Sequence, residues 1–520
     1  MSKSLRGRLL AAIFSVGAAG AIAAPAAAET LADAIAMAYE SNPTLQAQRA
    51  TQRALDETFV QARAGWRPTL SLTGQANYSE TRTPRMALMV DTNGDGVPDT
   101  QRPGATTFSE SNSAAAGISF SQPIWTGGRV AAAVSAVQSD IMQGRENLRR
   151  IESQVIGQVV QAYADVRRDQ EALRIRQENV AVLQRQLEES NARFEVGEIT
   201  RTDVAQSQAR LAAAQSQLQV AEAQLGNSRS NYAAAVGRNP GTLEPEPSLA
   251  FLLPPTVDEA FTVAESFNPQ LRAQQFAEQA SRARVAGARA ERMPTVSVNS
   301  GLTFGGPAEP FDRDLYSREF TARATVTVPL FNGGLTTSRI RQSIERNNAD
   351  RINIETQRRT VLQQVTQSWN QLIAARANIG STAEQVRAAR IAAEGTRQEQ
   401  QVGLRTTLDV LNAEQELRNA ELSQVSARRD EYVAAASVLS AMGRLEARNL
   451  IPTEPRYDPK ANFRKLRITW GWVPWEEAIS IVDRTVAVPP IPQPKDKPLE
   501  APIPPGLQPP PANDAAPQPR

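Results

Sequence analysis

The sequence predicts a protein of mixed α and β structure, assembled from two copies of one pattern. Long stretches with apolar residues spaced every three or four positions indicate α-helices. Four shorter stretches alternate polar and apolar residues, as β-strands do. Several motifs recur in the same order in both halves of the chain. A length of 520 residues by itself suggests about three domains, but the repeated order favours two copies of one elongated unit.

The repeated motifs keep a constant spacing within each half. The Asn-Pro pair at Asn42 matches the pair at Asn268, and the run Pro123–Gly128 matches Pro329–Gly334. The first copy carries an insertion after Pro68 that the second copy lacks. We therefore divide the chain into a signal peptide (1–28), a first repeat (29–245), a second repeat (246–450), a C-terminal segment (451–488) and a proline-rich tail (489–520), which we expect to be disordered.

Each copy is expected to contain a helix, two strands, a very long helix and a shorter helix. The very long helix of the first copy carries apolar residues that step by three and four, as in a coiled coil. At 1.5 Å per residue, such a helix spans on the order of 100 Å. One apolar seam buries little surface, so we expect packing against neighbouring helices to bury the remaining apolar surface. The expected helices cover residues 30–64, 129–194, 202–236, 257–291, 335–399 and 408–442.

Strands are expected at residues 69–78, 116–122, 295–304 and 320–328. Their length and alternation suit a transmembrane β-barrel or a soluble sandwich with one wet face. Four strands cannot close a barrel alone, and open strand edges are not tolerated in lipid. Either the strands belong to a soluble sandwich, or several chains together complete one barrel. Beyond the N-terminus, no stretch reaches the roughly 18 consecutive apolar residues that indicate a transmembrane helix.

The N-terminus has the features of an export signal. Lys3, Arg6 and Arg8 precede an apolar stretch, and Ala26–Ala28 offers a cleavage site. The apolar stretch is too short for a transmembrane anchor. Removing residues 1–28 takes away three basic residues and no acidic residue, so the net charge changes from +2 to −1. A nearly neutral mature chain argues against a nucleic-acid partner.

The composition excludes several kinds of enzyme. The chain has no cysteine and no histidine, so it cannot form disulfides or Cys/His zinc sites, and it lacks cysteine nucleophiles and histidine bases. Catalysis by paired carboxylates, as in a glycosidase, stays open on composition alone. However, no acidic pair marks a pocket, and 5% aromatic residues are few for a sugar-binding cleft. We expect no enzymatic activity and no cofactor, apart from the calcium considered below.

The motifs together resemble the TolC-type outer-membrane efflux proteins. The resemblance covers residues 30–450 and includes the sequence VGxxTxxD at the turn that follows each very long helix. It implies a homotrimer in which four strands per chain form one 12-stranded transmembrane β-barrel, continued by a long periplasmic α-helical coiled-coil barrel. Trimerisation would remove the open strand edges. The implied location is the outer membrane of a Gram-negative bacterium, in contact with its lipid.

The implied function is the outer-membrane channel of a tripartite export system. Such a channel is a passive duct that opens when a periplasmic adaptor and an inner-membrane ABC or proton-driven transporter engage it. With no cysteine after the signal, the chain resembles the non-lipidated branch, which serves type I protein secretion, multidrug efflux or both. The alternative is a coiled-coil spacer protein of the cell envelope. A spacer would explain the heptads, but not the four strands or the duplication.

The two VGxxTxxD motifs are the expected tips of helical hairpins. Each glycine can adopt the left-handed conformation that ends a helix, and each Thr-x-x-Asp can cap the next helix. Capping alone could therefore explain the two aspartates. The resemblance implies that the tips meet the adaptor. The expected contact residues are Val196, Gly197, Val402, Gly403 and Leu404.

The resemblance also implies a gate at these tips. Arg405 matches the gate arginine of the family, Asp203 matches its carboxylate partner, and Asp409 matches an acidic ring at the constriction. Gln400 stands where family members can carry a gate tyrosine, and Asn412 where a second acidic ring can occur. We therefore expect the closed state to be held differently, with a less cation-selective entrance.

Two further segments carry hypotheses of their own. Asp91, Asn93, Asp95 and Asp99 lie in the insertion with the spacing of the first part of a calcium loop, but Arg102 replaces the final glutamate. Calcium binding there competes with a simple polar surface loop, which the barrel would place outside the cell. The C-terminal segment, with tryptophans at positions 470, 472 and 475, is expected to pack around the middle of the helical barrel.

Overall fold

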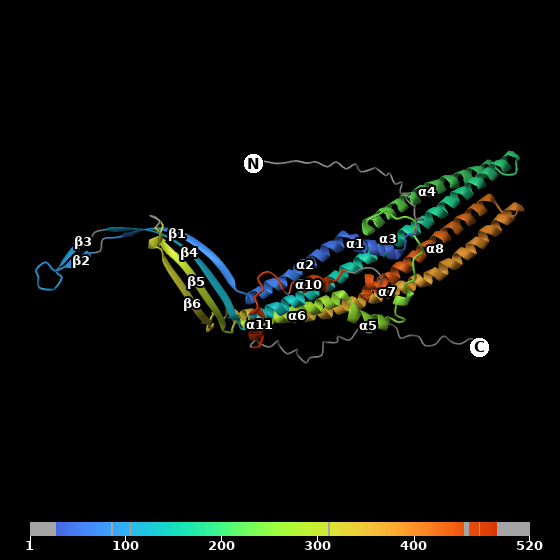
Figure 1. The fold of residues 1–520 in the computed structure, drawn as a ribbon. Helices are drawn as coiled ribbons and strands as arrows, with labels where there is room; N and C mark the ends of the chain where they lie inside the picture. Colours follow the sequence, from blue (N-terminus) through green and yellow to red (C-terminus); the bar gives the residue numbers. More distant parts are fainter. Residues whose placement is uncertain are drawn as a thin grey trace, which may run out of the picture.

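The computed structural model describes residues 28–84, 87–103, 106–309, 312–451, 457–466 and 468–485. Of the expected signal peptide only Ala28 is described, and the proline-rich tail lies outside the described residues. The molecule is elongated, with a sheet at one end, packed helices in the middle, and two helical hairpins at the other end (Figure 1).

The same order of elements occurs in both halves of the chain. The first half contains α1 (Leu31–Ser41), α2 (Pro43–Arg63), η1 (Ala64–Trp66), β1 (Thr69–Thr83), β2 (Ala87–Val90), β3 (Thr100–Pro103), β4 (Thr107–Trp125), α3 (Arg129–Glu195) and α4 (Arg201–Val236). The second contains η2 (Ala250–Leu252), α5 (Val257–Phe267), α6 (Pro269–Ala290), β5 (Thr295–Pro307), η3 (Arg313–Leu315), β6 (Ser317–Thr327), α7 (Leu335–Gln401) and α8 (Thr407–Ala441). The short helices α9 (Ala447–Leu450), α10 (Pro459–Lys465) and α11 (Glu476–Thr485) follow.

The first helical stretch of each copy is two helices rather than the one expected. Asn42 ends α1 and caps α2, because its side-chain oxygen accepts the backbone amides of Thr44 and Leu45. The proline that follows cannot supply a backbone hydrogen bond and disfavours helical geometry in the residue before it. Asn268 breaks the second copy in the same way, between α5 and α6.

The very long helices α3 and α7 each contain 67 residues. Each is therefore about 100 Å long. Most of the predicted seam of α3 is buried or half-buried, including Val159 and Val166, whereas Phe194 at its end is 44% exposed. The main core lies near the middle of the molecule, where α1, α3, α4 and α8 pack around Tyr163 and Tyr232. The long helices thus join the core to both ends of the molecule.

The four expected strands form one antiparallel sheet in the order β1-β4-β5-β6. Within the chain, β1 and β6 are its two edges. The turn-rich insertion also contains the hairpin β2–β3, which the sequence analysis did not predict. In that hairpin Arg102 pairs with Leu88, so Arg102 belongs to a strand and not to the loop it follows.

The register sorts the sheet into two chemically different faces. Residues that pair across the strands point to the same face, and the side chains of each strand alternate between faces. One face is mostly apolar and carries Leu70, Leu72, Phe120, Ile118, Leu302, Phe304, Phe320 and Val326. The opposite face is polar or small and carries Thr69, Ser71, Thr73, Ser119, Ser121, Asn299, Thr303, Thr321, Arg323 and Thr325.

The apolar face is uncovered in the single chain, with Leu70 at 72%, Leu72 at 77% and Phe320 at 67% exposure. A contiguous apolar face of this kind marks a surface that contacts another protein or lipid. In the part of the chain that the structure describes, no helix is both long enough and apolar enough to span a bilayer.

Candidate functional site

Two hairpin tips form the end of the molecule opposite the sheet (Figure 1). One joins α3 to α4 through residues 196–200, and the other joins α7 to α8 through residues 402–406. Gly197 has φ +79° and Gly403 has φ +81°, a conformation that costs residues with a Cβ about 1–2 kcal/mol. The left-handed glycines predicted from the sequence are thus confirmed, and they permit the tight reversal of each long helix.

The two predicted capping boxes are also present. At the first tip, the Thr200 side chain and backbone donate to the Asp203 carboxylate, and the Asp203 amide donates back to Thr200. Thr406 and Asp409 make the same arrangement at the second tip. The hydrogen bonds from Thr406, aided by the charge of Arg405, hold the pKa of Asp409 below its usual value. Each aspartate therefore starts a helix, whatever further role it has.

Each tip also holds a close ion pair. Arg405 Nε lies 2.8 Å from Glu399 Oε2, and at the first tip Arg193 Nε lies 3.0 Å from Glu198 Oε2. Within the chain, Arg405 therefore pairs with Glu399, a residue that the sequence analysis did not single out, while Asp203 is engaged by Thr200. No ion pair joins Arg405 to Asp203 within this chain, and the pair between them stays a prediction.

The tips expose apolar side chains between these charges. Val196 is 72% exposed, Val402 70% and Leu404 75%. All three belong to the expected adaptor contacts. All three lie in the turns that join the helices, so they form small apolar projections at the end of the molecule. That is a suitable surface for a protein partner.

Gln400 and Asn412 lie just behind the tips and take part in side-chain contacts. Gln400 is 4% exposed, and its amide donates to the Thr407 hydroxyl at 3.3 Å. Asn412 Oδ1 accepts a 2.8 Å hydrogen bond from Arg210 on α4. This bond links the two hairpins. Both residues therefore have structural partners, and their predicted place at a gate is not tested.

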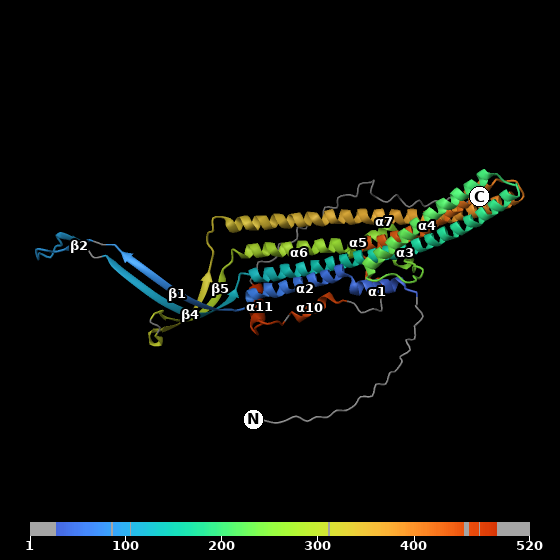
Figure 2. The same ribbon diagram turned by 90° about the horizontal axis from the view of Figure 1, so that it is seen from above.

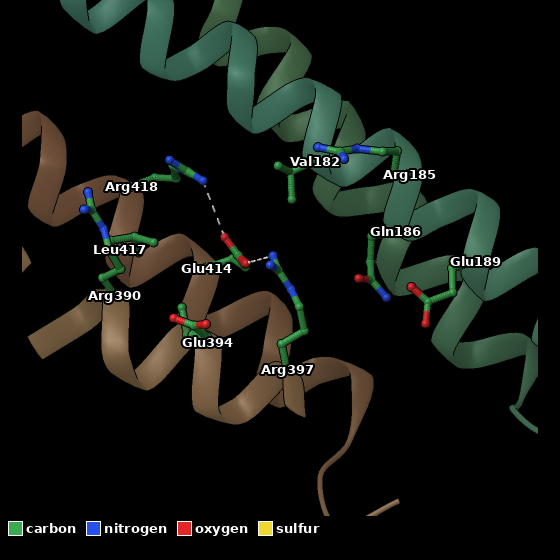
Figure 3. A pocket seen from close by; sticks show the side chains of 11 residues that line it. Val182, Arg185, Gln186, Glu189, Arg390, Glu394, Arg397, Glu414, Leu417 and Arg418 are labelled. Carbon is green, nitrogen blue, oxygen red and sulfur yellow. Dashed lines mark hydrogen bonds and ion pairs between the residues drawn. The ribbon is translucent and has the colours of Figure 1, made fainter. Parts of the chain in front are cut away.

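A charged pocket of about 400 Å³ lies between the hairpins, where α3 faces α7 and α8 (Figure 3). Its centre is Glu414, which is 5% exposed and pairs with Arg397 and, at 3.7 Å, with Arg418. Arg185 and Glu189 of α3 line the opposite wall. No local motif in the sequence predicts this cluster, because residues from three helices meet there.

A second missed cluster lies where the sheet meets the helices. Asp483 of α11 is fully buried and accepts hydrogen bonds from Trp66 Nε1 at 3.0 Å, Thr126 N at 2.8 Å and Gly128 N at 3.1 Å. Glu476, also fully buried, lies 2.7 Å from Arg63 and 2.8 Å from Arg67. These contacts fix the C-terminal segment to the strand–helix junction.

The tryptophans of the C-terminal segment were expected to pack around the middle of the helices. The segment instead extends from there to the sheet. α10 does pack along the helices, since the Phe463 ring lies 4.8 Å from that of Phe59 on α2. Trp475 instead donates a 3.1 Å hydrogen bond to Gln122 at the end of β4. The expected position was wrong for Trp475, because the buried acids of α11 anchor the segment at the sheet.

The loop with the calcium-like spacing closes on its own backbone. Asp91 accepts amide hydrogen bonds from Asn93, Gly94 and Gly96, and these bonds lower its pKa. Asp99 accepts instead from Thr92. Among the described residues, no group of three or more carboxylates is arranged to hold a metal ion. Calcium binding at this loop stays an untested hypothesis.

Comparison with known proteins identifies the family. The sequence pattern of the family described as "Outer membrane efflux protein" matches residues 34–238 and 262–444, one stretch in each half of the chain. The chain is 31% identical to the outer membrane efflux protein BepC of Brucella suis, covering 86% of this chain and 92% of that protein. It is 25% identical to the outer membrane protein TolC of Vibrio cholerae, covering 84% and 96%.

The fold agrees with solved channel structures. The outer-membrane channel OprN superposes with a TM-score of 0.66 at 19% identity, covering 79% of this chain and 89% of that one. The four-stranded sheet, the paired long helices and the two hairpin tips are thus the features of a known architecture. The chain belongs to the outer membrane efflux protein family.

Proposed function

We propose that three copies of this chain form a passive duct through the outer membrane, the exit channel of a tripartite export system. The observation that carries the proposal is the four-stranded sheet with one apolar and one polar face, joined directly to helices of 67 residues. A sheet of this kind suits lipid on one side and water on the other. A coiled-coil spacer would not need it.

The sheet edges explain why several chains are needed. In lipid, unpaired backbone groups at a strand edge are too costly, so the sheet must close. β1 and β6 run in opposite directions, because each neighbouring pair in β1-β4-β5-β6 is antiparallel. β1 of one chain can therefore pair with β6 of the next in an antiparallel ladder, and a cyclic arrangement of identical chains uses every edge. Three chains with four strands each give a 12-stranded barrel.

The helices would continue the barrel as a periplasmic tunnel about 100 Å long. The two hairpin tips would form its entrance. The exposed Val196, Val402 and Leu404 suit contact with a periplasmic adaptor, which links the duct to an inner-membrane ABC or proton-driven transporter. Type I protein secretion, multidrug efflux or both are compatible with such a duct.

The proposed lock at the entrance involves Arg405. In its own chain Arg405 already pairs with Glu399, and an exposed ion pair contributes only about 0–1 kcal/mol. A lock therefore needs a second contact, which Asp203 of a neighbouring chain would supply in three symmetry-related copies. Loss of that contact should favour the open entrance, so single-channel conductance in planar bilayers should rise in Arg405→Ala.

Two variants test where the effect comes from. Arg193→Ala removes the equivalent ion pair at the first tip and should leave conductance unchanged. Glu399→Gln removes only the partner within the chain. If Glu399→Gln opened the channel as much as Arg405→Ala does, the contact within the chain would suffice and Asp203 would have no part in the lock. An unchanged conductance in Arg405→Ala would refute the lock altogether.

An Asp409 ring is proposed to attract cations at the narrowest point of the entrance. Asp409→Asn removes the charge, while the amide oxygen can still accept a capping hydrogen bond. Asp203→Asn is the matched control, because Asp203 holds the same capping position at the other tip. Reversal potentials in a salt gradient should show weaker cation preference in Asp409→Asn only. Equal selectivity in both variants and in the wild type would contradict the ring.

A further inference from the structure

The C-terminal segment from residue 468 to the end of α11 lies at the level where the sheet joins the helices. Both views show α11 beside the helix-proximal ends of the strands (Figures 1 and 2). Two buried acidic side chains hold the segment in this position. Asp483 is bonded to the β4–α3 connection through Thr126 and Gly128, and Glu476 is held between Arg63 and Arg67. The segment is therefore a firmly attached part of the junction.

The segment lies on the apolar side of the sheet. Phe120 and Gln122 are two positions apart on β4, so they share a face, and Gln122 pairs in register with Val298 of the apolar face. Trp475 reaches this face, because its indole nitrogen donates to Gln122 Oε1 at 3.1 Å. Trp475 thus lies next to the row of side chains that would meet lipid.

Several large apolar side chains of the segment are uncovered. Trp470 is fully exposed at 100%, Ile468 is 73% exposed, and Trp475 is 48% exposed. On α11, Ile481 is 61% and Val482 49% exposed. We call residues 468–475 together with Ile481 and Val482 the tryptophan collar. The buried acids of the segment have partners within the chain, whereas the exposed apolar side chains of the collar are uncovered.

Tryptophan is enriched where a membrane meets water, because its ring is largely apolar and its N–H needs a polar partner. A neighbouring chain is a poorer fit for the collar. Neighbours would meet the sheet at its edges β1 and β6. Glu476 and Asp483 do contact residues just before β1, but Trp475 is bonded to Gln122 on the interior strand β4. The collar instead continues the apolar face of the sheet at its helix-proximal end.

We propose that the tryptophan collar binds the lipid headgroup region at the periplasmic surface of the outer membrane, and so sets how deeply the barrel sits. This rests on the proposed function, which places the sheet in lipid. The buried Asp483 and Glu476 transmit the anchor to the strand–helix junction. The partner is a phospholipid surface, recognised by indole rings at the boundary between acyl chains and water.

Site-directed spin labelling tests the proposal, and the cysteine-free chain allows single labels without background. The full-length protein would be labelled at Trp470→Cys, reconstituted in phosphatidylethanolamine–phosphatidylglycerol vesicles, and probed with oxygen, which partitions into lipid, and with a water-soluble nickel complex. A second label at Val482→Cys keeps every tryptophan in place. Leu72→Cys is the lipid control and Val402→Cys, at a hairpin tip, is the water control.

Labels at positions 470 and 482 should show a depth between the two controls, at the headgroup level. A label that matches the Val402 control would mean that the collar lies in water, and the proposal would be wrong. Shielding of both collar labels from oxygen and from the nickel complex would mean that protein covers the collar, which also overturns it. If the Leu72 label itself behaves as a label in water, the sheet is not in lipid, and the proposed function fails first.

Discussion

Asp483 provides the sharpest test of how the sheet is joined to the helices. Its buried carboxylate accepts hydrogen bonds from the Trp66 indole, the Thr126 amide and hydroxyl, and the amides of Gly128 and Ala131. All of these groups are donors, so the site requires an acceptor at both carboxylate oxygens. Asp483→Asn keeps the size of the side chain but replaces one oxygen with a donor.

The cost follows from the donors that lose their acceptor. If the asparagine oxygen takes the place of Oδ1, the Thr126 and Gly128 amides keep their partner, and Trp66 Nε1 and the Ala131 amide face an NH₂ group. Each buried donor left without an acceptor costs about 1–3 kcal/mol. The total is about 4 kcal/mol, which corresponds to about a thousandfold larger population of the detached segment, since 1.4 kcal/mol is tenfold.

Hydrogen–deuterium exchange measures this local opening directly. The amides of α11 should exchange about a thousandfold faster in Asp483→Asn, while those of α8 stay unchanged. Glu477→Gln, a neutralisation of the exposed neighbouring acid in the same helix, should leave α11 protected. Unchanged exchange of α11 in Asp483→Asn would refute the role given to the buried carboxylate.

Three further predictions concern the tips and the insertion. Gly403→Ala should destabilise the second tip by about 1–2 kcal/mol in thermal unfolding, because Gly403 has a positive φ. Gly395→Ala, in open space within α7, should stabilise the protein slightly. Equal effects of the two substitutions would contradict this prediction. The folded-state pKa of Asp409 is lowered from 3.8, so its stabilisation is complete above that value and is lost as the pH falls through the lowered pKa. Exchange at the start of α8 should accelerate in that acid range in the wild type, and an equal acceleration in Asp409→Asn would argue against the assignment. Because the amides of the loop already engage the Asp91 carboxylate, terbium luminescence should show no saturable uptake. A stoichiometric signal lost in Asp95→Asn would establish a calcium site.

Features that depend on local sequence could be predicted. The strand pattern, the capping boxes and the left-handed glycines each follow from a few adjacent residues, and the structure has them where the sequence indicates. The break at Asn42 could also be predicted, because an Asn-Pro pair favours the end of one helix and the start of the next.

Features that depend on distant residues could not be predicted. Nothing near Asp483 in the sequence indicates that it caps a connection more than 350 residues away. Arg418 lies one turn from Glu414 on α8, but Arg397 reaches Glu414 only because α7 packs beside α8, and an acidic residue on a helix is usually solvated. Arg405 shows the same limit at closer range. It pairs with Glu399 in this chain, which no motif indicates, while the pair with Asp203 that the resemblance implies stays a prediction.

The central claim is that three chains close one barrel through their edge strands, and cross-linking tests it most directly. Because the chain has no cysteine, Ser71→Cys on β1 and Thr325→Cys on β6 would be its only thiols. Treatment of outer-membrane vesicles with a short bis-maleimide should give a ladder on denaturing gels that ends at three chains. Moving the first thiol to Ser119, which pairs with Ser71 on the same face but belongs to the interior strand β4, should abolish it. The account would be contradicted by monomers alone, or by a ladder that continues beyond three chains.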